Sequence, residues 1–243
     1  MSSTLTGGQL RYVPHTTQAP ESRWEFGLDL GQRKDHSAIA ATELLWTPQG
    51  RCPVSFEYLF EPRLHVRYLK RFPKGLSYDR IYSLVDGCIA TLAPVWRGVR
   101  RELIIDASGP GAPIVDRLRR NLDRDLVIRP MLITGGKIAR KLKGGYTSVP
   151  RRELISVIQL MMAAQTLKCA REIDGYQTLK DELLELGALD TQPVSGRTHD
   201  DLAIALGLAV WAATRRTPEL LPESEASRRQ NSRPSLYGPG PLF

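Results

Sequence analysis

Apolar and polar residues alternate in short runs through the first third of the chain. An alternation of this kind is typical of β-strands that bury one face. It predicts strands at residues 24–30, 37–45, 54–60 and 63–71. The period then changes to that of an amphipathic helix at residues 78–92, which Ser77 is suited to cap.

Strands and helices alternate in the remainder of the chain. The apolar runs at residues 102–106 and 127–133 have the length of strands, and Pro130 suggests an edge or a bulge in the second. Helices are expected at residues 114–120, 151–167, 176–186 and 200–214. The last of these is apolar nearly all round, which is typical of a buried helix. This order predicts an α/β fold, with a mixed β-sheet flanked by helices.

The predicted elements leave a segment at each end of the chain. Residues 1–22 are polar and aperiodic, so we expect a flexible N-terminal arm. Residues 217–243 are rich in proline, arginine and serine, and are expected to form a disordered tail. One folded domain is therefore predicted at residues 23–216, which is long enough to bury a sizeable core.

Composition narrows the cellular setting. No long uncharged apolar run occurs, so no membrane span is expected, and the first residues lack the pattern of a secretory signal. The cysteines at positions 52, 88 and 169 are far apart, which argues against a zinc site and against a disulfide framework. These features predict a cytoplasmic protein, or one of the host cytoplasm if it is viral.

The charge of the chain is basic and unevenly spread. With 34 Lys and Arg against 26 Asp and Glu, the formal net charge is +8, which favours polyanionic partners. Residues 126–152 contain no acidic residue and seven basic ones: Arg129, Lys137, Arg140, Lys141, Lys143, Arg151 and Arg152. Such a run is either a solvated loop or a surface that grips phosphates without reading sequence.

Four aspartates stand where a carboxylate is costly. Asp29 lies inside an apolar strand, Asp106 ends another, and Asp200 and Asp201 begin an apolar helix. Burying a carboxylate without a cation is unfavourable. Two metal ions about 3.5–4 Å apart would offset this cost and can promote phosphodiester cleavage. Carboxylate oxygens suit Mg²⁺ or Mn²⁺, so the pattern favours a two-ion metal centre.

Each aspartate also has an ordinary structural interpretation. Asp106 is a common residue in the turn after a strand. Asp200 and Asp201 are suited to cap a helix and to complement its dipole. Asp29 is harder to explain in this way, because Leu28 and Leu30 flank it and no Lys or Arg is adjacent. The metal-site hypothesis therefore rests on the aspartates taken together.

Several motifs between residues 24 and 211 resemble, in order, the nuclease domain of phage terminase large subunits, which belongs to the RNase H-like superfamily. FGLDLGQRKDHSAIAA resembles the first hairpin of these domains, and LIIDASGPGAPIVDRLR resembles their central strand and glycine-containing loop. SVPRRELISVIQLMMAAQTLKCA, GYQTLKDELLEL and THDDLAIALGLAVW resemble the helices that follow, the last being the HDD helix.

The resemblance implies an RNase H-like fold and a metal-dependent endonuclease that cuts concatemeric viral double-stranded DNA during packaging. The metal ligands and catalytic residues would be Asp29, Asp106 and the Asp200–Asp201 pair, with two Mg²⁺ or Mn²⁺ ions. Asp201 is favoured as the main ligand, because related Holliday-junction resolvases carry a similar Asp before a run of Leu, Ala and Ile. The two neighbours cannot face the sheet equally, since a helix turns about 100° per residue.

The resemblance also suggests supporting residues. His199 would support a ligand or touch the scissile phosphate, unless it is only part of the helix cap. Asp35 would order the hairpin loop rather than bind metal. Arg151 stands where the family usually has a lysine, which preserves charge but not geometry. The DNA-binding residues would be Lys137, Arg140, Lys141, Lys143 and Arg151.

One departure from the family is large. Full terminases carry an ATPase motor ahead of the nuclease, whereas this sequence contains no G-x-x-x-x-G-K-[ST] phosphate loop. The chain is therefore expected not to translocate DNA by itself. It would be an isolated domain, a separate gene product that works with a motor, or a relative with another function. Besides double-stranded DNA, its expected partners are a separate ATPase motor, a small terminase subunit and a portal, with no membrane.

Other functions are compatible with the same residues. A Holliday-junction resolvase or a repair nuclease would use the same fold and carboxylates. A non-catalytic DNA-binding packaging subunit would need only the basic residues. The segment DLGQ at residues 29–32 resembles the first phosphate loop of actin-like sugar kinases and ATPases, but these proteins need two such domains and no second phosphate loop is visible.

Overall fold

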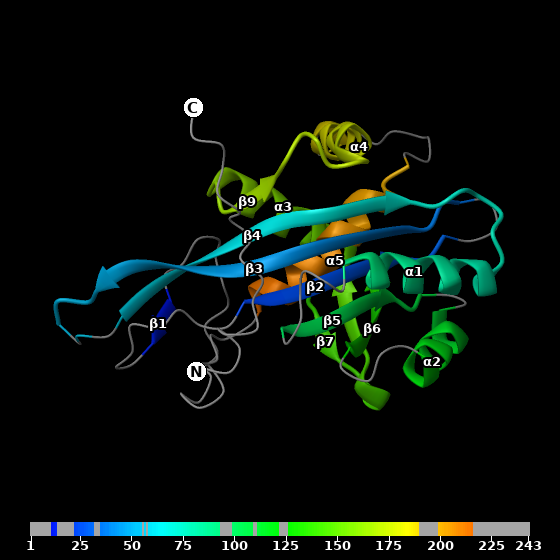
Figure 1. Cartoon of the computed structure of the whole chain (residues 1–243), viewed down its shortest axis with the longest axis horizontal. Coiled ribbons are helices and arrows are strands. Elements are labelled where there is room, and N and C mark those ends of the chain that lie inside the picture. Colours follow the sequence, from blue (N-terminus) through cyan, green and yellow to red (C-terminus); the bar gives the residue numbers. More distant parts are fainter. Residues whose placement is uncertain are drawn as a thin grey trace, which may run out of the picture.

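The sheet of this protein has helices on both of its faces (Figure 1). The computed structural model describes residues 11–13, 22–31, 35–54, 56, 58–92, 99–108, 111–121, 126–189 and 199–215. Within these residues the chain forms a nine-stranded sheet in the order β1-β4-β3-β2-β5-β6-β8-β7, with β9 paired to β4. The predicted α/β fold class is confirmed.

The long strands of the sheet are β2 (Arg23–Asp29), β3 (Ala38–Arg51), β4 (Tyr58–Arg71), β5 (Arg100–Asp106) and β6 (Leu126–Thr134). The short ones are β1 (Arg11–Val13), β7 (Arg140–Lys141), β8 (Thr147–Pro150) and β9 (Leu167–Cys169). The helices are α1 (Tyr78–Leu92), α2 (Gly111–Asn121), α3 (Arg151–Ala163), α4 (Tyr176–Leu189) and α5 (Asp201–Thr214), and Lys143–Gly145 form a 3₁₀ turn.

The direction of the strands defines the topology. β2, β3 and β4 form an antiparallel meander, after which β5 pairs with β2 in parallel and β6 pairs with β5 in parallel. An order of β4-β3-β2-β5-β6 with these directions is that of the RNase H-like fold. The carboxyl ends of the central strands β2 and β5 therefore lie side by side at the same end of the sheet.

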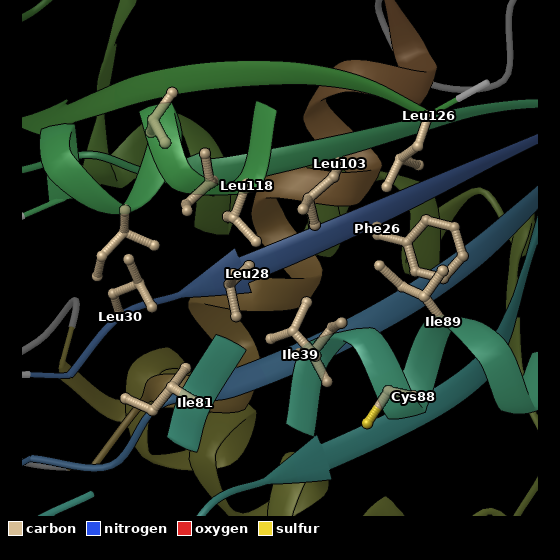
Figure 2. Packing of buried hydrophobic residues seen from close by; sticks show 14 of the residues in the cluster. Phe26, Leu28, Leu30, Ile39, Ile81, Cys88, Ile89, Leu103, Leu118 and Leu126 are labelled. Atoms are coloured by element: carbon tan, nitrogen blue, oxygen red, sulfur yellow. The ribbon is translucent and has the colours of Figure 1, made fainter. Parts of the chain in front are cut away.

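The two faces of the sheet are covered by different helices. Phe26 and Leu28 of β2, with Leu103 of β5, pack against α1 and α2 in one buried cluster (Figure 2). On the opposite face, Ile104 of β5 packs with Ile204 of α5. Helix α5 is buried from Asp201 to Ala213, which confirms the prediction from its apolar sequence. Each such Leu or Ile stabilises the fold by about 1.5–3 kcal/mol.

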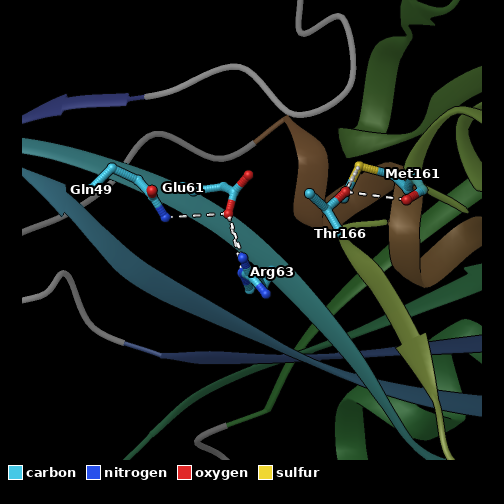
Figure 3. A network of polar contacts seen from close by, with 5 residues as sticks. All are labelled: Gln49, Glu61, Arg63, Met161 and Thr166. Atoms are coloured by element: carbon cyan, nitrogen blue, oxygen red, sulfur yellow. Dashed lines mark hydrogen bonds and ion pairs between the residues drawn. The ribbon is translucent and has the colours of Figure 1, made fainter. Parts of the chain in front are cut away.

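Several element boundaries differ from the prediction. The strands expected at residues 54–60 and 63–71 are the single strand β4, which pairs with β3 from Ala38↔Arg71 to Arg51↔Tyr58. A cross-strand hydrogen bond joins polar positions of this hairpin, since Glu61 of β4 accepts from Gln49 of β3, and Glu61 also accepts from Arg63 within β4 (Figure 3). Pairing with a neighbouring strand therefore extended both strands beyond their apolar runs.

Two other local predictions can be compared with the structure. Helix α3 ends at Ala163, earlier than expected, and Thr166 then donates a hydrogen bond to the Met161 carbonyl at 3.2 Å (Figure 3). Pro130 lies inside the sheet, next to β5, but β8 pairs with β6 only from Met131 onward, so Pro130 lies before that pairing begins. The Ser77 cap is confirmed by a 3.3 Å hydrogen bond from the Arg80 N–H to Oγ.

The two terminal segments fall largely outside the described residues. Of the predicted arm at 1–22, Arg11–Val13 pair with β4 as β1, and Ser22 is buried. The predicted tail at 217–243 lies wholly outside the described residues. In the part of the chain that the structure describes, no helix is long and apolar enough to cross a membrane.

Candidate metal centre

Strands β2 and β5 bring Asp29 and Asp106 together. Leu28 is paired with Ile105 in the parallel register, so the two aspartates follow as the last residues of neighbouring strands. Leu28 and Ile105 both point toward α1 and α2. Because side chains alternate along a strand, Asp29 and Asp106 point to the opposite face, which α5 covers.

Helix α5 brings Asp201 to the same end of the sheet. The helix crosses β2 at Gly27, where an added Cβ atom would lie 1.8 Å from the carbonyl oxygen of Ala205. Gly27 is two residues before Asp29, and Ala205 is one helical turn after Asp201. The absence of a side chain at Gly27 therefore lets the first turn of α5 approach the ends of β2 and β5.

Electrostatics indicate that these carboxylates form one cluster. Burial raises the pKa of Asp29 well above its usual value, and the charges of Asp106 and Asp201 raise that pKa further, while Arg151 opposes the shift. Burial also raises the pKa of Asp106. That rise is opposed by Ser108, whose backbone N–H donates to Asp106 Oδ1 at 2.9 Å. Like charges held this close favour protonation or a bound cation.

Asp201 and its neighbour Asp200 are placed differently. The side chain of Asp201 is only 7% exposed, and its Oδ2 is buried without a hydrogen-bond partner among the described residues. Burial raises its pKa, against the charges of His36 and Arg71. Asp200 occupies the N-cap position without a side-chain capping bond in the described structure, and it forms an ion pair with Arg151.

Glu182 is a buried acid of this site that the sequence did not reveal. It lies on α4 with 4% of its surface exposed, accepts the Ala203 N–H at 2.8 Å and pairs with Arg71 at 3.2 Å. Burial raises its pKa to about 7, and the charge of Asp201 adds to that rise. Its position in the inward-facing stripe of α4, three residues after the buried Leu179, is the signal that could have indicated it.

Two histidines lie near Asp201, and a lysine contacts one of them. The ring centroids of His36 and His199 are 5.6 Å apart, with the rings nearly perpendicular. His36 Nδ1 is 2.7 Å from the carbonyl oxygen of Phe72, and Lys74 Nζ is 3.2 Å from His199 Nε2. Asp35 is half-buried, and its charge raises the pKa of Asp201.

The donor set suits a hard divalent cation. Within the described residues, no three His, Cys, Asp or Glu side chains are gathered closely enough to hold a metal ion as they stand. The carboxylates nevertheless fit such an ion chemically, because they offer oxygen donors, they repel one another, and Asp201 buries an oxygen without a partner.

The basic segment lies at one edge of the sheet and extends toward this centre. Four of its exposed members lie in the part of the sequence between β6 and β8: Lys137, Arg140, Lys141 and Lys143. Arg151, at the start of α3, connects the segment to the centre through its ion pair with Asp200. Arg129 is instead paired with Glu102 at 2.5 Å on the sheet, so a structural contact accounts for that member of the run.

The chain was compared with proteins of known sequence and structure. No protein-family model matches it, and no curated protein sequence matches it significantly. The chain is similar in structure to two terminase nucleases. The large terminase nuclease from thermophilic phage G20c is 16% identical with a TM-score of 0.42, covering 84% of this chain and 92% of that one. The human cytomegalovirus terminase nuclease domain, soaked with Mn, is 15% identical with a TM-score of 0.49, covering 90% and 92%.

A third similar structure is that of Thermus thermophilus RuvC, which is 10% identical with a TM-score of 0.29 and covers 79% of this chain and 93% of that one. These are the classes of protein that the sequence motifs resemble. Because each TM-score is below 0.5, the function proposed below rests on the residues of this chain.

Proposed function

We propose that the chain is a metal-dependent endonuclease that hydrolyses phosphodiester bonds of DNA. Asp29, Asp106 and Asp201 would hold the divalent cations, which are expected to be two Mg²⁺ or Mn²⁺ ions. The observation that carries the proposal is the buried Oδ2 of Asp201, which has no hydrogen-bond partner among the described residues and lies near carboxylates whose pKa values are raised. A bound cation would remove both the repulsion and the unsatisfied oxygen.

The side chains of the centre would have different roles in the reaction. When bound, the cations supply Lewis-acid chemistry and neutralise charge on the phosphate. Asp29 and Asp106 stand on rigid neighbouring strands and would fix the position of the reacting phosphorus relative to the sheet. Asp200 would assist by holding Arg151, whose guanidinium is suited to contact a phosphate oxygen at the edge of the centre.

The substrate would be double-stranded DNA. Lys137, Arg140, Lys141 and Lys143 are exposed in one segment, and Arg151 links that segment to the carboxylates. Ammonium and guanidinium groups in such a row bind phosphates without selecting a base sequence. We further propose that the cleavage serves genome packaging, with an ATPase motor, a small terminase subunit and a portal as partners, because the ordered motifs of the chain resemble those of terminase nuclease domains.

A cleavage assay tests the proposal. Full-length protein is incubated with supercoiled plasmid, linear duplex and a four-way junction, each with Mg²⁺ or Mn²⁺ and with chelator. We expect nicking or linearisation of the plasmid that needs the metal and is lost in Asp29→Asn and Asp106→Asn. Asp86→Asn, at an exposed position of α1, is the matched control and should cleave normally. Undiminished cleavage in both site variants would refute the assignment of these aspartates. Preferential cleavage of the four-way junction would indicate a junction resolvase instead.

A further inference from the structure

His36 is held in a defined orientation by the backbone of another segment. Its Nδ1 lies 2.7 Å from the carbonyl oxygen of Phe72, and a carbonyl oxygen can only accept a hydrogen bond. Nδ1 must therefore carry the proton, which leaves a lone pair on Nε2 of the neutral ring. A metal-binding histidine almost always donates its other ring N–H to such a carbonyl, carboxylate or water.

The segment that carries His36 is anchored on both sides. The Phe72 N–H donates to the Ser37 carbonyl at 2.8 Å, so two hydrogen bonds join this loop to the end of β4. The Gly31 N–H donates to Ser37 Oγ at 3.1 Å, which ties the same loop to the end of β2. His36 is thus positioned before any ligand binds, at the end of the sheet where Asp29 lies.

The ring of His36 lies next to the first turn of α5. It meets the ring of His199 edge-on, with centroids 5.6 Å apart, and His199 is two residues before Asp201. Among the neighbouring side chains that lower the pKa of Asp201, His36 has the largest effect, which places its ring close to this carboxylate. The Oδ2 atom of Asp201 is buried without a partner among the described residues, so an oxygen donor and a nitrogen donor stand near each other.

His199 is less suited to the same role. Lys74 Nζ lies 3.2 Å from His199 Nε2. Because an ammonium group has only donors, Nε2 of His199 must accept this hydrogen bond and its lone pair is engaged. Of the two histidines beside Asp201, only His36 presents a ring nitrogen whose lone pair is not engaged by a contact among the described residues.

We propose that Nε2 of His36 is a ligand of the divalent cation that Asp201 holds. This inference rests on the metal centre of the proposed function and extends its ligand set from oxygen alone to nitrogen and oxygen. Imidazole nitrogen binds first-row transition ions in preference to Mg²⁺, which takes oxygen ligands. The cation site nearest α5 would therefore select Mn²⁺ over Mg²⁺.

Metal binding to the full-length protein, without DNA, tests this ligand. Calorimetry with Mn²⁺ and with Mg²⁺ gives the two affinities, and pulsed electron paramagnetic resonance of bound Mn²⁺ detects nitrogen hyperfine coupling. We expect this coupling in the parent protein. In His36→Asn we expect it to disappear and the Mn²⁺ affinity to fall at least about tenfold, since even loss of an outer partner of a metal-binding histidine costs 10–100-fold.

Two further variants sharpen the result. In the His36→Asn variant already described, the side-chain amide N–H replaces Nδ1–H, so the hydrogen bond to the Phe72 carbonyl can persist. His36→Gln instead places an amide oxygen near the position of Nε2 and should move the preference from Mn²⁺ toward Mg²⁺. His199→Asn removes the neighbouring histidine and is the matched control, which should retain the nitrogen coupling.

The outcomes separate this inference from the proposed function. Nitrogen coupling that persists in His36→Asn, or that is lost only in His199→Asn, overturns the assignment of His36. If Mn²⁺ binding depends on Asp201 but the parent protein shows no nitrogen coupling, the assignment of His36 is also overturned. The carboxylate metal centre is then still supported. Absence of any Mn²⁺ or Mg²⁺ binding, with absence of cleavage, overturns both.

Discussion

Gly27 of β2 and Ala205 of α5 are in backbone contact, because a Cβ atom at position 27 would lie 1.8 Å from the Ala205 carbonyl oxygen. The same helix also approaches α3 closely, where a Cβ at Gly207 would lie 2.9 Å from Leu154 Cβ. Because Gly27 and Gly207 have no side chain, α5 packs directly against the sheet and against α3. The distance between α5 and the sheet in turn determines how close Asp201 lies to Asp29 and Asp106 at the ends of β2 and β5.

Gly27→Ala is expected to destabilise the protein by about 3 kcal/mol or more. Overpacking a core typically costs about 1–3 kcal/mol, and here the obstruction is backbone, which cannot rotate away as a side chain can. The same displacement of α5 should abolish cleavage. Denaturation in urea measures the change in the free energy of unfolding.

Gly87→Ala is the control for this substitution. Gly87 lies within α1, where a new Cβ atom meets nothing within 4 Å. Alanine is favoured over glycine in a helix interior by up to about 1 kcal/mol, so this variant should be as stable as the parent or more so. Equal stabilities of Gly27→Ala and Gly87→Ala would refute the close approach of α5 to β2.

The sequence was sufficient for the features that depend on local pattern. Asp29 and Asp106 each interrupt an apolar strand, and Asp201 opens a helix without a polar face, so their unusual positions are visible in the sequence itself. The buried path of α5 follows from the same property. The RNase H-like topology was given by a family resemblance rather than by periodicity.

Features that depend on tertiary pairing were not accessible in this way. The length of the β3–β4 hairpin follows from cross-strand contacts, and the division of β4 into two strands was therefore wrong. Glu182 and His36 are distant in sequence from Asp201 and come to lie near it only when α4 and the loop before β3 pack beside the start of α5. In the sequence DELLEL, only the position of Glu182 on the apolar stripe of the helix distinguishes it from its exposed neighbours.

Asp29→Asn is expected to stabilise the metal-free protein at neutral pH. Because the pKa of Asp29 is raised in the folded state, the folded protein binds a proton that the unfolded chain has already lost, and stability falls as the pH rises from the ordinary pKa toward the raised one. Asn has no charge to desolvate and avoids this fall. Urea denaturation in chelator should show that the advantage of the variant shrinks as the pH is lowered toward 4.

The stability of the metal-free parent should also respond to Glu182. Burial raises its pKa from an ordinary value of 4.5 to about 7 in the folded state. The stability contributed by the protonated acid is therefore complete below about pH 4.5, declines as the pH rises, and is lost above about 7. Glu182→Gln removes this decline and keeps an oxygen for the Ala203 N–H. Each pKa unit corresponds to about 1.4 kcal/mol.

Denaturation of the parent and Glu182→Gln between pH 5 and 8 checks this assignment. The free energies of unfolding should diverge in favour of the variant as the pH rises and become parallel above about pH 7. Glu185→Gln, three residues further along the same helix and exposed, should follow the parent at every pH. A parent curve parallel to that of Glu182→Gln throughout would show that Glu182 is ionised normally.

The basic segment makes a prediction that does not depend on catalysis. If Lys141 and Lys143 each neutralise a phosphate, replacing both with alanine should weaken duplex binding and reduce the slope of log affinity against log salt by about 1.8, since each contact contributes about 0.9. Fluorescence anisotropy in chelator, over a range of salt concentrations, measures this slope without cleavage. Lys168→Ala is a suitable control, because β9 lies beside β4 on the opposite side of the sheet from β7. An unchanged slope in the double variant would mean that the segment is a solvated loop, and the phosphate contacts would have to be sought elsewhere.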